Sequence, residues 1–128
     1  MSKNLKTVST DDYDAVVATV QAYVDGLKSG RVTDLSKAFH GDAVMYGFTN
    51  GALMGGPITN LYDFVEKNGK ATEVRTRIDI LAITPTTAVV RVDMEKDVIG
   101  LDYTDFHSLL KQDGTWRIIA KVYHAYED

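Results

Sequence analysis

Apolar residues near the start of the chain recur at the spacing of an amphipathic helix. The residues that share one helical face are Val16, Val20, Tyr23, Val24 and Leu27. Residues 9–12, Ser-Thr-Asp-Asp, have the pattern of a capping box, and Ser29-Gly30 is a typical helix end. The pattern therefore predicts a first helix over residues 9–29.

Two further helices are predicted before the chain changes to strands. A short one covers residues 33–39, followed by a turn at residues 40–42 and a strand at residues 43–48. After the glycine-rich segment 50–56, Pro57 suits the first position of a third helix. The apolar stripe Ile58, Leu61, Tyr62 and Val65 supports that helix, and Asn68-Gly69 is expected to end it.

The rest of the chain alternates between apolar and polar residues, which is typical of strands with one buried face. Residues 73–83 and 88–95 show this alternation, and residues 102–110 and 116–124 flank Asp113-Gly114. Asp-Gly between two strand-like runs is a strong hairpin signal. Helices first and strands afterwards predict an α+β fold.

Composition narrows the classes of function. The 128 residues have a formal net charge of −4, with 45% hydrophobic and 25% charged residues, which is ordinary for a globular chain. The acidic balance argues against nucleic-acid binding, and the lack of cysteine excludes disulfides and thiolate metal sites. With no signal-peptide or membrane-helix pattern, we expect a cytoplasmic protein with a polar tail at residues 1–8 and a single domain at residues 9–128.

The closing hairpin carries the candidate chemistry. Side chains alternate across a strand, so Tyr103, Asp105 and His107 share one face. A two-residue turn would continue that face through Trp116, Ile118, Ala120, Val122 and His124, whereas a three-residue turn with a bulge would set Phe106, Ser108 and Leu110 opposite the face of Trp116. Buried acids and histidines need partners or a ligand, so this face predicts a pocket.

Several segments together resemble the nuclear transport factor 2-like superfamily. They are residues 23–30 (Tyr-Val-Asp-Gly-Leu-Lys-Ser-Gly), residues 39–43 (Phe-His-Gly-Asp-Ala), the Pro57 helix and residues 113–118 (Asp-Gly-Thr-Trp-Arg-Ile). The superfamily includes ketosteroid isomerases, polyketide cyclases and a bacterial group named for lumazine binding. The resemblance implies a cone of three N-terminal helices on a strongly bent antiparallel sheet, a ligand cavity, and a homodimer through the outer sheet face.

The resemblance also suggests roles for single residues. In ketosteroid isomerases a helix-1 tyrosine and a protonated late-strand aspartate form an oxyanion hole. Tyr23, within Gln-Ala-Tyr-Val, matches the tyrosine, and Asp105 matches the aspartate. The position of the general base falls on Gly47, which has no side chain. Steroid isomerase chemistry is therefore not expected.

The residues point to a cavity and leave three functions open. The expected ligand-binding residues are Tyr23, His40, Met45, Gly47, Tyr103, Asp105, His107 and Trp116, and the catalytic candidates are Asp105, His107 and Tyr23. No cofactor is implied, and no metal site is expected because the three histidines lack ligand spacing.

The first function is the binding of an apolar or aromatic small molecule above a Tyr, Asp and His floor. The second is an isomerase, cyclase or dehydratase with His107 or His40 as base. The third is a dimeric interaction module with a closed or dry cavity, in which Tyr23 is bonded directly to Asp105.

Overall fold

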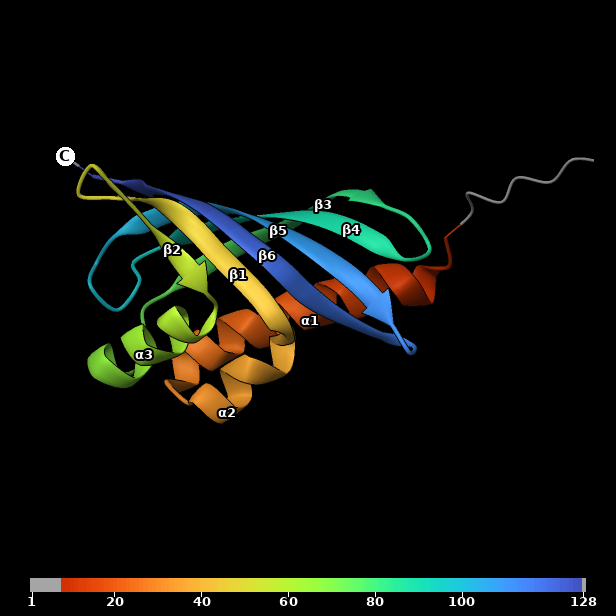
Figure 1. The fold of residues 1–128 in the computed structure, drawn as a ribbon, viewed down its shortest axis with the longest axis horizontal. Helices are drawn as coiled ribbons and strands as arrows, with labels where there is room; N and C mark the ends of the chain where they lie inside the picture. Colours follow the sequence, from red (N-terminus) through yellow and green to blue (C-terminus); the bar gives the residue numbers. More distant parts are fainter. Residues whose placement is uncertain (1–7, 128) are drawn as a thin grey trace, which may run out of the picture.

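The structure, a computed structural model, describes residues 8–127. The polar tail predicted at residues 1–8 therefore lies outside the described residues, apart from Val8. A curved six-stranded sheet forms one layer, and the helices pack on its concave face (Figure 1). The α+β prediction is confirmed. No helix within residues 8–127 is both long enough and apolar enough to cross a membrane.

The helices follow the predicted apolar pattern closely. Helix α1 spans Thr10–Ser29, with Ser9 as N-cap and Gly30 as C-cap at φ 69°, and buries the predicted stripe. Helix α2, Val32–Leu35, continues as a 3-10 turn, Ser36–Ala38. Helix α3 spans Thr59–Asn68. Pro57 does not begin this helix as predicted, because it ends a strand and pairs with Val44.

The six strands are β1 (Phe39–Thr49), β2 (Ala52–Pro57), β3 (Arg75–Ile83), β4 (Thr87–Glu95), β5 (Asp102–Gln112) and β6 (Thr115–Tyr126). Their order in the sheet is β2-β1-β6-β5-β4-β3. Strand β1 pairs in parallel with β6, so the sheet is mixed rather than wholly antiparallel. The glycine-rich segment predicted as a connection forms β2, and the turn predicted at residues 40–42 is an irregular part of β1 where the register with β6 shifts.

Of the two turns that the sequence left open for the closing hairpin, the structure has the two-residue turn. Asp113 and Gly114 both have positive φ, 51° and 78°, as a type I′ turn requires. The register then changes, because Leu109 pairs with Ile118 whereas Ser108 pairs with Ala120. Ile119 is therefore the extra residue of a β-bulge.

The bulge corrects the predicted inner face of β6. Before it, Trp116 and Ile118 point inward, as predicted; after it, Lys121 and Ala125 are the buried residues. Of the residues predicted to lie inward, Val122 is 52% exposed, His124 is also exposed, and Ala120 is only partly buried. One extra residue reverses the alternation of every side chain that follows it.

Candidate functional site

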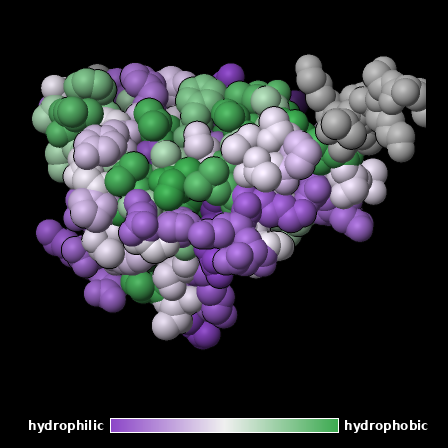
Figure 2. All heavy atoms as spheres, turned by 45° about the vertical axis from the view of Figure 1, so that its right-hand side comes forward, coloured by the Kyte–Doolittle hydropathy of each residue, from purple (hydrophilic) through white to green (hydrophobic). Residues whose placement is uncertain are grey.

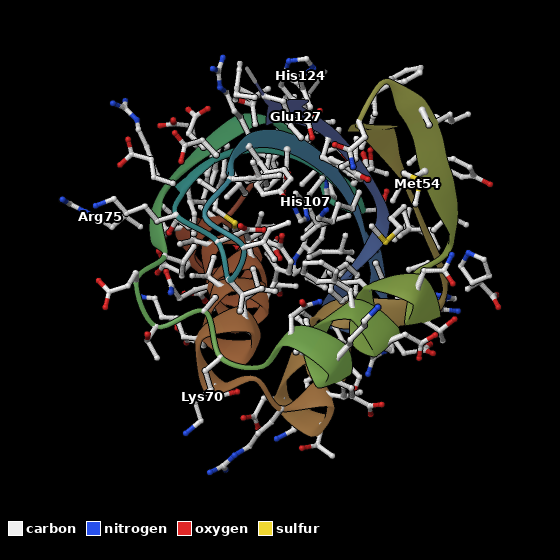
Figure 3. The ribbon with its side chains drawn as sticks, turned by 90° about the vertical axis from the view of Figure 1, so that its left-hand side faces the viewer. Met54, Lys70, Arg75, His107, His124 and Glu127 are labelled. Atoms are coloured by element: carbon white, nitrogen blue, oxygen red, sulfur yellow. The ribbon has the colours of Figure 1, made fainter. Side chains whose placement is uncertain are left out.

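A cavity of about 330 Å³ lies between the concave face of the sheet and the helices. Figure 3 looks along the curved sheet, with the ribbon encircling the interior, where His107 is found. Most of the cavity wall is apolar, from helices α1 and α3, strands β1, β2 and β4, and the loop before β5. The apolar lining residues include Leu27, Met45, Met54, Leu61, Phe64, Val65, Met94 and Val98.

One end of the cavity is polar. Tyr23 from α1, Tyr103 and Asp105 from β5, and Lys121 and Tyr123 from β6 line it. Asp105 is only 1% exposed and Lys121 only 5%, so both are almost completely removed from bulk water. Three of the residues proposed from the sequence, Tyr23, Tyr103 and Asp105, thus line the same cavity. A mainly apolar pocket with a few convergent polar groups is typical of small-molecule sites.

Asp105 is the acceptor at the centre of the polar cluster. The Tyr23 hydroxyl donates to Asp105 Oδ2 across 3.1 Å, and His107 Nε2 lies 3.2 Å from the same oxygen. With the Nε2 proton donated to Asp105, the other imidazole nitrogen, Nδ1, is unprotonated. Asp105 Oδ1 and His107 Nδ1 have no hydrogen-bond partner among the described residues.

The electrostatic surroundings favour an ionised Asp105. Burial by itself would raise the pKa of Asp105, but the charge of Lys121 and the hydrogen bonds from His107 and Tyr23 lower it below its ordinary value. Burial, followed by the charge of Asp105, raises the pKa of Tyr23 well above its ordinary value, so its hydroxyl stays a donor. The pair therefore differs from the oxyanion hole of the resemblance, whose aspartate is protonated.

His107 is buried and neutral. Burial is the main cause that lowers the pKa of His107; the hydrogen bond to Asp105 and its charge oppose this, and the positive charge of Lys121 lowers the pKa further. Its ring also packs 4.9 Å from the Tyr23 ring, centroid to centroid. His107 does not line the cavity itself, but it contacts Asp105, which does.

Lys121 is the site residue that sequence reasoning missed. The bulge at Ile119 turns Lys121 to the inner face, where it pairs across the strands with His107. Burial lowers the pKa of Lys121 below its ordinary value, although the charge of Asp105 opposes this change. Its Nζ lies 4.2 Å from the centroid of the Tyr123 ring. A lysine in an otherwise apolar stretch, Ile118-Ile-Ala-Lys-Val122, was the available signal.

Other predicted site residues lie away from the cavity. His40 Nε2 lies 3.2 Å from Gln112 Oε1, beside the β5–β6 turn. Trp116 is buried, and its indole N–H donates to Asp12 Oδ1 across 3.1 Å. His124 lies on the outer side of the sheet (Figure 3), with its ring 4.8 Å from that of Tyr126. Neither His40 nor Trp116 is a lining residue.

Gly47 does not widen the cavity. A Cβ atom at this position would lie 2.4 Å from the carbonyl oxygen of Tyr123 and 2.6 Å from its ring. The space next to Gly47 is therefore filled by Tyr123, the residue that the bulge turns inward. Met45, on the same strand, lines the cavity. Within residues 8–127, no group of three or more metal-ligating side chains comes together.

Comparison with known proteins places the chain in a family. A family model described as "Putative lumazine-binding" matches residues 11–124. A relative named Aldolase FrzH, from Cladobotryum sp, is 37% identical over 121 residues, covering 94% of this chain and 97% of the relative.

Solved structures agree with this assignment. An NTF2-like protein of unknown function from Methylobacillus flagellatus KT has a TM-score of 0.89 and 36% identity, covering 95% of this chain and 98% of that one. A second, from Shewanella baltica OS155, has a TM-score of 0.87 and 31% identity over 95% and 99% of the two chains.

A ketosteroid isomerase-like protein from Erwinia carotovora atroseptica shares the fold, with a TM-score of 0.72 at 14% identity over 94% of this chain and 100% of that one. Its identity is too low to carry residue roles. The chain therefore belongs to the lumazine-binding family of nuclear transport factor 2-like proteins.

Proposed function

We propose that the cavity binds a small, mainly apolar or aromatic molecule that presents an acceptor oxygen, such as a carbonyl, to Lys121. The observation that carries the proposal is the polar end of the cavity, where a buried lysine faces an apolar wall. A buried amine without an acceptor is costly, so a ligand oxygen at this point stabilises the complex.

The hydrogen-bonding capacity of the polar end supports this choice of ligand. The Tyr23 hydroxyl is already donated to Asp105, and the Thr49 hydroxyl is bonded to that of Tyr123 at 3.1 Å. Within residues 8–127, Lys121 forms no ion pair shorter than 4.0 Å. Lys121 is therefore the donor left to meet a ligand, and it selects ligands with acceptor oxygens, while Asp105 Oδ1 is an acceptor left without a partner.

The names of the relatives suggest the ligands to test first. Lumazine, named in the family description, is a flat aromatic ring system with carbonyl oxygens, so its chemistry matches the cavity. Aldehydes and ketones are the second class, because the relative from Cladobotryum is named an aldolase. Both classes combine an apolar body with an acceptor oxygen.

The binding experiment is a thermal-shift and calorimetric screen of lumazine, aromatic ketones and aromatic aldehydes. Met94→Trp, on the cavity wall, should abolish binding because the larger ring fills the cavity. Val89→Trp is the matched control, since Val89 lies on the same strand with its side chain 38% exposed. Binding that survives in Met94→Trp, or no binding by any member of the panel, would contradict the proposal.

A second candidate is an enzyme that removes a proton next to a carbonyl, as isomerases, cyclases and dehydratases do. The specific observation in its favour is the unpartnered Oδ1 of Asp105, an ionised acid beside the cavity. Asp105 is then the base, and His107 positions it, instead of His107 or His40 acting directly. Deuterium exchange at the α-carbon of a bound ketone, followed by NMR, tests this, and exchange unchanged in Asp105→Asn would refute it.

The interaction module is the least supported of the three functions. Tyr23 is bonded directly to Asp105, as that function predicted, but a cavity of about 330 Å³ argues against it.

The homodimer through the sheet stays a prediction, as does the cytoplasmic location. Figure 2 shows hydrophobic residues in the upper half of the molecule, where Figure 1 has the sheet. Exposed apolar residues on the sheet include Tyr46, Phe48, Phe106 and Val122, and light scattering on the purified chain measures the mass.

A further inference from the structure

We propose that Lys121 is a carbonyl-reactive amine, whose Nζ forms an imine with an aldehyde or ketone held in the cavity. This inference rests on the proposed function, because it names the substrate class and the reacting atom of the same site. Lys121 lines the cavity at its polar end and is only 5% exposed. The Lys121 amine is therefore accessible to a ligand in the cavity but almost inaccessible to bulk water.

Burial of Lys121 raises the share of its free-amine form, the nucleophile, above that of an exposed lysine at the same pH. Burial removes the water that would solvate an ammonium group, and the pKa of Lys121 is lowered accordingly. The charges of Asp105 and Asp97 oppose this lowering of the pKa, but neither carboxylate forms an ion pair with Nζ within 4.0 Å in residues 8–127. Lysines activated for carbonyl chemistry are desolvated in this way.

Lys111 shows the contrast within the same sheet. Its Nζ lies 2.9 Å from Asp12 Oδ1, in a direct ion pair at the surface. That carboxylate occupies the space beside the Lys111 amine that a carbonyl carbon would need. Lys121 has no comparable ion pair within the described residues, so its Nζ is free to approach a ligand.

The reaction balances with the groups that are present. The Nζ lone pair attacks the carbonyl carbon, a C–N bond forms, and the C=O π electrons move to oxygen, which takes up a proton lost by nitrogen. The C–O bond of this carbinolamine then breaks, and the oxygen leaves as water with the second amine proton, giving the C=N bond. A water molecule carries these protons between nitrogen and oxygen, because Asp105 forms no direct contact with Nζ among the described residues. No oxidant or reductant is needed.

The test is reductive trapping. The purified chain is incubated with 3-phenylpropanal and sodium cyanoborohydride at neutral pH, and the adduct is located by intact mass and peptide mapping. We expect one early adduct, on Lys121, and its loss in Lys121→Met. Lys70→Met is the matched control, since Lys70 is an exposed lysine that points away from the interior (Figure 3), and the adduct should persist there.

Two further measurements keep the outcome clear. Circular dichroism checks that Lys121→Met is folded. In the second measurement, lumazine is added to the unchanged chain and should slow the labelling by occupying the cavity, because lumazine does not form this imine readily. Labelling spread evenly over surface lysines would overturn the inference. A thermal shift with lumazine but no adduct on Lys121 would overturn this inference alone, whereas neither shift nor adduct would also overturn the proposed function.

Discussion

Replacing Asp105 with asparagine should destabilise the fold through the loss of one buried charge. Asp105 pairs with Tyr123 and Lys121 with His107, so Asp105 and Lys121 are diagonal neighbours, with Cβ atoms roughly 7 Å apart. At that distance and an effective dielectric constant of about 20, opposite unit charges attract by about 2 kcal/mol. The hydrogen bonds from Tyr23 and His107 also lose the strengthening that a charged acceptor provides, together about 1 kcal/mol.

We therefore expect Asp105→Asn to lower the free energy of unfolding by about 3 kcal/mol at neutral pH. The assay is urea unfolding followed by the fluorescence of Trp116, which is buried and is the only tryptophan of the chain. Asp63→Asn, an exposed carboxylate on α3, is the matched control and should change stability by less than about 0.5 kcal/mol.

A double-mutant cycle isolates the charge interaction. In the Lys121→Met background, Asp105→Asn should cost about 2 kcal/mol less, because the attraction to Lys121 is already absent. The coupling should also shrink at high pH, where Lys121 loses its proton. A coupling energy below about 0.5 kcal/mol at neutral pH would refute the reasoning that Lys121 and Asp105 form an electrostatic pair.

Three further predictions concern the same region. Tyr23→Phe should lower the free energy of unfolding in urea by about 2 kcal/mol, because the Asp105 carboxylate loses one of its two hydrogen bonds; an unchanged midpoint would contradict that bond. Lowering the pH should reduce the stability difference between the unchanged chain and Asp105→Asn, since the folded pKa of Asp105 is below its ordinary 3.8. The contribution of the Asp105 charge to the free energy of unfolding is complete above pH 3.8 and is lost as the pH falls below it. Urea unfolding curves of both chains, recorded over a series of acid pH values, measure this loss. Gly47→Ala should cost about 1–3 kcal/mol through its clash with Tyr123, whereas Gly41→Ala, with nothing within 4 Å, should cost less than half as much.

The periodic parts of the fold could be predicted from the sequence. The apolar stripe on α1 and the alternation along β3 and β4 each identify one buried face, and Asp113-Gly114 specifies a type I′ turn. The Tyr23–Asp105 contact was inferred from the resemblance, since the two residues are 82 positions apart and no local pattern relates them. The parallel pairing of β1 with β6 had no local signal either.

The sequence by itself determined a helix with one buried face and a hairpin with one face that includes an acid and a histidine. Only the tertiary structure decided which face of β6 completes the site. In the segment Ile118-Ile-Ala-Lys-Val122, apolar residues occur at both even and odd positions, because the outer face of the sheet is apolar as well. Alternation alone therefore could not specify which face of β6 points inward. Packing at both ends of β6 decides it, because Trp116 and Ile118 are buried at one end and Ala125 at the other. Ile118 and Ala125 are seven positions apart, and strict alternation cannot place residues with an odd separation on the same face. The bulge at Ile119 accommodates this separation and brings Lys121 into the cavity.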